Sequence, residues 1–190
     1  MFFNALVYLA RRFVKKPQNI RKSTKVEAGI VAKLIVLFYG DEANAPAIAD
    51  AAAAGAKSIR FAEVDVRAGT ETATRHKRVD SAETVAEYDG VVIAAPAGTT
   101  HAALVTLLEK FERDGGVSNK VFGIAAGDAE LRERLSRTGG IVVTMRPDAD
   151  ALHAAKHLGA RVLKVAGWVR HGLGHEAEHH HHDHSHDHRH

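Results

Sequence analysis

The stretch that most constrains the fold is residues 33–56. It begins with an almost unbroken apolar run at 34–39, stops at Gly40 and becomes an alanine-rich segment at 45–56. A short run rich in branched residues predicts a strand buried on both faces, as in parallel sheets. The alanine-rich segment predicts a helix with Asn44 as its N-cap. Strand, short loop and helix form the opening unit of a doubly wound α/β domain, where the loop after the first strand is the usual ligand site.

The rest of the chain repeats this alternation. Further strands are expected at 59–66, in the apolar centre of 88–98, at 120–127 and at 141–145, and helices at 81–87, from Thr99 or Thr100 onward, at 129–138 and from Asp148 or Asp150 to about His171. Five strands separated by helices predict one parallel sheet with right-handed crossovers. The second strand alternates apolar and polar residues, as an edge strand does, which favours the strand order 2-1-3-4-5.

Length and composition bound the function. The 190 residues predict one domain, 33–172, with a basic extension at 1–32 and a tail at 173–190. Cysteine is absent, which excludes disulfides, thiolate metal sites and cysteine nucleophiles, and fits the cytoplasm. The net charge of +3 arises mainly in the extension, so nucleic-acid binding is not expected. Neither a Walker-type loop nor a G-x-G-x-x-G motif follows the first strand. This argues against the binding of nucleoside triphosphates by a Walker-type loop and of dinucleotides by a classical dinucleotide-binding motif.

The extension at 1–32 combines apolar residues at helical spacing with a following run of arginines and lysines. Its apolar part is too short to span a bilayer, which requires about 20 apolar residues. A basic amphipathic segment can lie on an anionic membrane surface, which would make the protein peripheral to the membrane. The alternative, which we favour, is a solvated extension or an over-long gene start.

Three segments carry a resemblance to a known family. They are LIVLFYG (34–40), SAETVAEYDGVVIAAPAG (81–98) and TLLEKFERDGGVSNKVFGIAAG (106–127), and the similarity covers roughly 33–171. The chain resembles the flavodoxin-like family and, within it, the tryptophan-repressor-binding-protein type of NAD(P)H:quinone oxidoreductase. The resemblance implies a flavodoxin-like three-layer sandwich with a five-stranded parallel sheet, followed here by a disordered histidine-rich tail.

The resemblance also implies function. It implies FMN held by the loops after strands one, three and four, NAD(P)H as reductant, a quinone as acceptor, and a homo-oligomer. Carried onto this sequence, the cofactor-binding positions are Gly40, Asn44, Ala97, Gly98, Thr99, Thr100, Ala126 and Gly127. No catalytic residue is identified.

The sequence departs from the family pattern at these loops. Residues 40–47 contain no serine or threonine but carry Asp41 and Glu42, which would repel a phosphate, and Pro46, which lacks an N–H donor. The loop after the third strand has no arginine, and 125–128 replaces a serine- and threonine-rich turn. The alternative function is therefore a non-catalytic binding or scaffold module that has lost its flavin.

Other polar residues could add chemistry to the same loops. Thr99 and Thr100 could donate to a flavin, although capping of the following helix is favoured. His101 together with Asp41, Glu42 and Asp128 could form an acid/base or metal constellation, but solvated side chains are the more usual outcome.

The last helix carries two further candidates. His153 and His157 are spaced i, i+4 and could bind a metal, although packing or surface placement is favoured. Trp168 is expected to pack against the domain.

The tail offers a separate metal-binding capacity. From His175 to the end, nine of sixteen residues are histidines, interrupted by Asp, Glu, Ser and Arg. Imidazole is the commonest protein ligand for Ni²⁺, Zn²⁺ and Cu²⁺. The predicted ligands are His175, His179, His180, His181, His182, His184, His186, His188 and His190. The alternatives are a purification tag, which the interruptions disfavour, and a tail that binds metal only incidentally.

Overall fold

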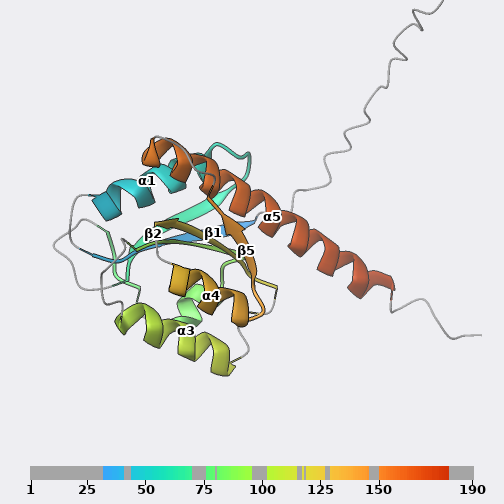
Figure 1. Cartoon of the computed structure of the whole chain (residues 1–190). Coiled ribbons are helices and arrows are strands. Elements are labelled where there is room, and N and C mark those ends of the chain that lie inside the picture. The colour runs from blue at the N-terminus through green and yellow to red at the C-terminus, as the bar shows by residue number, and fades with distance from the viewer. Residues whose placement is uncertain are drawn as a thin grey trace, which may run out of the picture.

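The computed structural model contains one parallel sheet whose order confirms the prediction. It describes residues 32–40, 44–69, 76–79, 81–95, 102–114, 117, 119–126, 129–145 and 150–179. The strands are β1 (Lys33–Phe38), β2 (Glu63–Ala68), β3 (Gly90–Ala94), β4 (Val121–Ala126) and β5 (Ile141–Thr144). They are all parallel and lie in the order β2-β1-β3-β4-β5 (Figure 1). The fold is a flavodoxin-like α/β sandwich.

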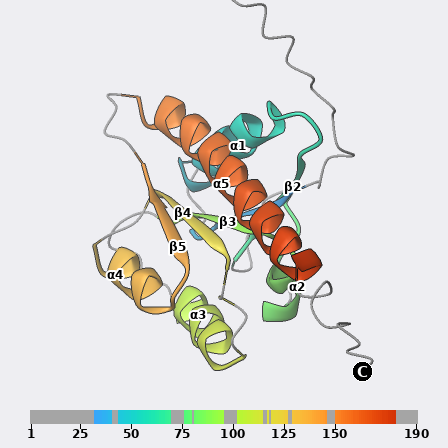
Figure 2. The same cartoon turned by 90° about the vertical axis from the view of Figure 1, so that its right-hand side faces the viewer.

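Helices cover both faces of the sheet. One layer contains α1 (Asn44–Lys57) and α5 (Ala151–His179), and the other contains α2 (Ala82–Ala86), α3 (Ala102–Asp114) and α4 (Ala129–Arg137). Figure 1 shows α1 and α5 above the sheet and α3 and α4 below it, and Figure 2 shows α5 running obliquely across its layer. The helix predicted at 81–87 is present as α2, and Ser81 is its N-cap, since the Ser81 hydroxyl accepts a hydrogen bond from the Thr84 backbone N–H (3.3 Å).

The strand β1 supplies the centre of both cores. Because side chains alternate along a strand, Leu34, Val36 and Phe38 pack toward α1 and α5, whereas Ile35 and Leu37 pack toward the opposite layer. All five are fully buried, and burial of each such side chain contributes about 1.5–3 kcal/mol. This explains why the apolar run at 34–39 predicted the fold so well.

Two glycines bring α1 and α5 into close contact. A Cβ on Gly55 would lie 1.8 Å from the carbonyl oxygen of Lys156, and one on Gly159 would lie 2.0 Å from that of Ala52. Only a residue without a side chain fits where each backbone approaches this closely. The first half of α5 is therefore fixed against α1.

The second strand begins later than predicted. Residues 59–61 belong to the turn that follows α1, in which the Ile59 backbone N–H donates to the Ala56 carbonyl (2.9 Å) and Phe61 has a φ of 64°. That left-handed residue reverses the chain before β2 starts at Glu63. The prediction that this is a partly exposed edge strand is confirmed.

The helix α5 is longer than predicted. It continues through Gly172 and Gly174 to His179, a total of 29 residues and about 44 Å. Each glycine costs a helix only about 1 kcal/mol, and the following Glu176, Ala177 and Glu178 favour helix. Trp168 was expected to pack, but it is 71% exposed, so that prediction is wrong.

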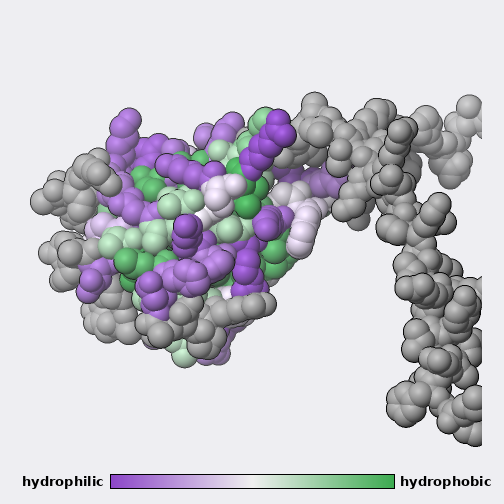
Figure 3. Space-filling model, turned by 90° about the horizontal axis from the view of Figure 1, so that it is seen from above, coloured by the Kyte–Doolittle hydropathy of each residue, from purple (hydrophilic) through white to green (hydrophobic). Residues whose placement is uncertain are grey.

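The outer surface over α1 and α5 is mixed in character. Seen from above, hydrophilic and hydrophobic residues are interspersed on it (Figure 3). Within the described ranges, no helix has the length and apolar content needed to cross a bilayer.

Candidate functional site

The carboxyl edge of the sheet, defined here as the ends of β1, β3 and β4, is continuous past the strands themselves. The Tyr39 backbone N–H donates to the Ala94 carbonyl (3.0 Å), and the Ala95 N–H donates to the Ala126 carbonyl (2.8 Å). A register shift between Ile93 and Ala94 aligns β3 with the end of β4. These bonds hold the three strand ends side by side.

The chain turns away from β1 at Gly40, whose φ is 104°. This backbone conformation strongly favours glycine. The side chains that end β3 and β4, those of Ala94, Ala95 and Ala126, are methyl groups. The edge between β1 and β4 is thus lined by small side chains, and the strand order reverses there, between β1 and β3. Such a reversal is the usual position of a ligand crevice in open α/β sheets.

The β1–β2 side of this edge is filled. Tyr39 is buried, and burial raises the pKa of its hydroxyl. A Cβ on Gly69 would lie 2.2 Å from the Tyr39 ring, so the chain after β2 crosses directly over that ring. The His76 ring meets Phe38 edge to face at 5.2 Å and lies 3.6 Å from an Asp50 carboxylate oxygen. Side chains therefore fill the β1–β2 side of the carboxyl edge.

Three of the predicted cofactor positions belong to the described residues. Gly40 lies two residues after the end of β1, Asn44 is the first residue of α1 and is exposed, and Ala126 ends β4 and is half-buried. The structure brings the ends of β1 and β4 to one edge, as predicted. Ala97, Gly98, Thr99, Thr100 and Gly127 lie outside the described residues, as do Asp41, Glu42, His101 and Asp128.

The histidines divide into two groups. His153 and His157 are exposed and adjacent on the first turns of α5, with their Nε2 atoms 3.1 Å apart. His175 and His179 belong to the helical residues of α5, and the remaining predicted ligands, 180–190, lie outside the described residues. The described part of the chain brings together no group of three His, Cys, Asp or Glu suited to a metal ion.

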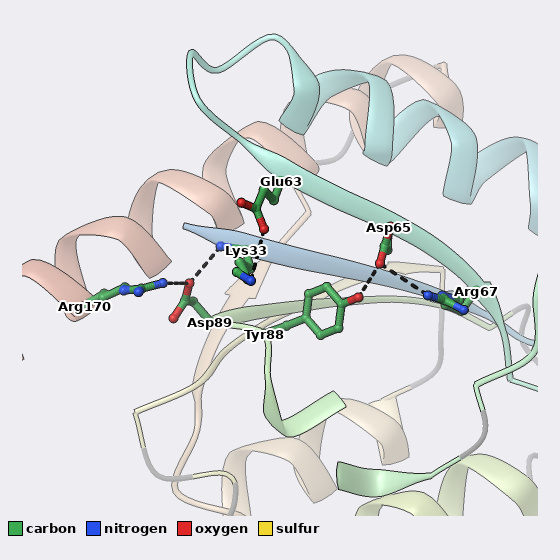
Figure 4. A network of polar contacts seen from close by, with 7 residues as sticks. All are labelled: Lys33, Glu63, Asp65, Arg67, Tyr88, Asp89 and Arg170. Atoms are coloured by element: carbon green, nitrogen blue, oxygen red, sulfur yellow. Dashed lines mark hydrogen bonds and ion pairs between the residues drawn. The ribbon is translucent and has the colours of Figure 1, made fainter. Parts of the chain in front are cut away.

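The opposite, amino edge carries a polar network that the sequence did not reveal (Figure 4). Asp89 Oδ2 accepts from the Lys33 backbone N–H (2.8 Å) and from Arg170 Nη1 (2.9 Å), which ties β1, β3 and α5 together. The Lys33 ammonium pairs with Glu63 (3.1 Å). Lys33 lies in β1, Glu63 in β2, Asp89 directly before β3 and Arg170 in α5. The network therefore joins the amino-terminal ends of three neighbouring strands to α5.

A second part of this network lies along β2. The Tyr88 hydroxyl donates to Asp65 Oδ2, and Arg67 lies 3.5 Å from the same oxygen. The hydrogen bond from Tyr88 lowers the pKa of Asp65. Burial, together with the Asp65 carboxylate, raises the pKa of Tyr88 to about 12.

Three cavities are lined by described residues. One of about 340 Å³ adjoins the amino-edge network and includes Glu63, Asp65 and Tyr88. A second, of about 350 Å³, contains the exposed rings of Phe61 and Trp168. The third, of about 550 Å³, lies beside α4 among Glu130, Glu133, Arg134, Arg137 and Thr138. None of the three is at the carboxyl edge.

Sequence reasoning missed the network because its partners are far apart along the chain. Tyr88 and Asp65 are separated by 23 positions, and Arg170 and Asp89 by 81. The available signal was Tyr88-Asp89-Gly90 directly before an apolar strand, since two polar residues there must lie at the amino edge.

Comparison with known proteins supports the fold. No protein-family model and no curated protein sequence matches the chain. Among solved structures, it is similar to the Streptococcus pneumonia TIGR4 flavodoxin (18% identity, TM-score 0.52, covering 70% of this chain and 98% of that one). It is also similar to a short-chain flavodoxin associated with a non-canonical PDU bacterial microcompartment (11% identity, TM-score 0.54, covering 72% and 99%). At these identities the likeness establishes the fold alone.

Proposed function

We propose that the carboxyl edge binds a flavin and that the protein is a redox protein of flavodoxin type, either an electron carrier or an NAD(P)H:quinone oxidoreductase. The observation that carries the proposal is the small-residue edge at the point where the strand order reverses. A bound flavin supplies reversible electron transfer, including hydride acceptance from NAD(P)H. The similarity to flavodoxins supports the same assignment by analogy of fold.

The residues present fit the two parts of FMN unequally. Gly40 and Ala126, which are not fully buried, add little bulk at the carboxyl edge, which suits a flat ring. The sequence of the loop does not favour a phosphate, because residues 40–47 contain no hydroxyl side chain and include two carboxylates. Each carboxylate about 4 Å from a phosphate charge opposes binding by about 1–4 kcal/mol, depending on the local dielectric. We therefore infer that the ring contributes most of the binding energy.

The test compares two ligands that differ only in the phosphate. The purified full chain is examined for visible flavin absorbance and is then titrated with riboflavin and with FMN, with flavin fluorescence as the readout. The expected result is that riboflavin binds at least as tightly as FMN. A colourless protein that takes up neither flavin would overturn the proposal.

Two variants locate the binding. Ala126→Leu places a larger side chain at the end of β4 and is expected to weaken both flavins at least tenfold. Ala54→Leu, at an exposed position of α1, is the matched control and should leave both affinities unchanged. The double change Asp41→Asn, Glu42→Gln is expected to favour FMN over riboflavin, because it removes the two charges that oppose the phosphate.

A second function is favoured by the register of histidines on α5. His171, His175 and His179, called here the carboxyl-terminal histidine stripe, recur at every fourth position of the sequence of α5. A module that holds Ni²⁺ or Zn²⁺ through this stripe and the following tail would need no flavin. Removing residues 180–190 and measuring the number of Ni²⁺ ions bound tests this function. Unchanged stoichiometry would contradict a tail site.

A further inference from the structure

We propose that His153 and His157 form a bidentate binding site for a divalent transition metal, Zn²⁺, Ni²⁺ or Cu²⁺, on the outer face of α5. Both side chains are exposed, and their rings lie 4.4 Å apart at 82°. Their Nε2 atoms are 3.1 Å apart. The two Nε2 atoms, which are within hydrogen-bond distance of each other in the metal-free pair, are close enough to bind the same ion.

The separation of the two nitrogens matches the requirement of a shared ion. With metal–nitrogen distances of 2.0–2.1 Å, two ligands 3.1 Å apart subtend an angle of about 98° at the metal. This value lies between the 90° of square or octahedral sites and the tetrahedral angle. The pair can therefore bind without a change of backbone and with only a small adjustment of the two rings.

The helix holds the pair in place. Asp150 Oδ1 accepts from the backbone N–H groups of Leu152 (2.9 Å) and His153 (3.2 Å), which fixes the first turn of α5. One turn further on, Lys156 and Gly159 lie against the backbone of α1. Because this segment is fixed at both ends, little conformational entropy is lost when the two rings bind one ion.

The pair is separated from the other histidines of α5. Within the described residues, no third His, Cys, Asp or Glu joins the pair to form a group suited to a metal ion. His171 is 14 residues further along α5, about 21 Å away along the axis. The pair and the carboxyl-terminal histidine stripe must therefore bind separate ions.

Metal-dependent stability distinguishes the pair from the tail. An ion that binds the folded state stabilises it, whereas binding that is equal in the folded and unfolded states does not. Histidines whose positions do not depend on the folded domain bind in both states, but the pair is brought together only while α5 is folded onto the domain. The experiment is urea unfolding of the full chain, followed by circular dichroism, without metal, with NiCl₂ or ZnCl₂, and after addition of EDTA.

At free metal ten times the dissociation constant of the pair, the folding equilibrium constant of the wild type is expected to rise about tenfold. His153→Ala and His157→Ala should each reduce that rise to less than twofold, each judged against its own midpoint without metal. Lys164→Ala, at an exposed position of α5 outside both groups of histidines, is the matched control and should retain the full effect. A wild type unaffected by both metals, or an equal rise in the two pair variants, overturns the site.

Discussion

The two edges of the sheet differ in the side chains that they carry and in the contacts that hold them. The amino edge is fastened by charged groups from four elements, with Asp89 joining the Lys33 backbone to Arg170. At the carboxyl edge, between β1 and β4, the described residues include Gly40, Ala94, Ala95 and Ala126, and backbone hydrogen bonds join the strand ends. Charged side-chain contacts are therefore found at the amino edge, and small residues end β3 and β4 at the carboxyl edge.

This difference separates two roles within one fold. Side chains at the amino edge are occupied with one another, so changes there should alter unfolding. At the carboxyl edge, small side chains make few contacts to lose, so changes there should alter ligand binding. The exception is the β1–β2 corner, where Tyr39 and Gly69 are in contact.

The largest effect is expected at that corner. Gly69→Val would place a side chain within 2.2 Å of the buried Tyr39 ring, and overpacking of this kind costs about 3 kcal/mol. Urea unfolding followed by circular dichroism measures the loss. Gly172→Ala is the matched control, since a Cβ there meets nothing within 4 Å, and it should stabilise α5 by up to about 1 kcal/mol. If Gly69→Val caused no loss of stability, the contact between residue 69 and Tyr39 would not fill the β1–β2 corner, and that corner would not be an exception within the carboxyl edge.

The next effect tests the fastening of the amino edge. Asp89→Asn keeps the shape but removes the charge that accepts from Lys33 and Arg170, and hydrogen bonds to charged groups contribute about 1.5–3 kcal/mol when buried, less at this partly exposed site. We expect a loss of about 1–2 kcal/mol in the free energy of unfolding. Glu133→Gln, which breaks the exposed pair with Arg137, should cost less than about 0.5 kcal/mol. Equal losses of unfolding free energy in the two variants would contradict the view that the amino-edge network is more stabilising than an exposed surface ion pair.

A smaller effect, with a defined pH dependence, is expected at Tyr88. The folded pKa of Asp65 is lowered, so its contribution is present above its usual pKa of 3.8 and is lost as the pH falls through the lower folded value. The folded pKa of Tyr88 is raised, so its contribution is present below pH 10 and is lost as the pH rises through about 12.

Tyr88→Phe should therefore destabilise the protein by about 1 kcal/mol near neutral pH. The difference from wild type should shrink in strong acid, where Asp65 becomes protonated, and above about pH 10, as Tyr88 begins to lose its proton. Urea midpoints over a pH series measure it. A difference that stays constant across the series would mean that the hydroxyl contributes only packing.

The smallest effect on stability is expected on the open side of the carboxyl edge. Ala126→Leu should change the free energy of unfolding by no more than about 0.5 kcal/mol, although it is designed to weaken flavin binding. The same unfolding assay, set beside the flavin titration, measures both quantities. A large loss of stability would show that the space at the end of β4 is already filled.

The fold could be predicted from local sequence patterns because its strands and helices are specified by residues that are close together in the chain. The apolar run at 34–39 and the repeated strand–helix alternation were sufficient to predict five parallel strands in the correct order. The helix α5 extends beyond the predicted end near His171 because the cost of Gly172 and Gly174 is small beside the favourable neighbours. The start of β2 was missed because the left-handed Phe61 has no sequence signature.

The candidate site was only partly predictable. Gly40 and Ala126 were assigned to one edge because the carboxyl ends of parallel strands meet there. The contacts of Asp65 with Tyr88 and of Asp89 with Arg170 depend on the register of distant elements, and no local pattern specifies that register. The 3.1 Å separation of His153 and His157 follows from ring orientation, which the i, i+4 spacing permits but does not fix.

The position of Trp168 gives the protein a built-in optical reporter. It is the sole tryptophan of the chain, and its exposure means that its fluorescence reports on the far half of α5 and changes little when the core unfolds. It lies three residues from His171 but 11 from His157, about 16 Å along the helix. Copper quenches indole emission at short range. Early quenching in a Cu²⁺ titration would therefore mark occupation of the carboxyl-terminal stripe, and unquenched emission with bound copper would mark the pair at the other end.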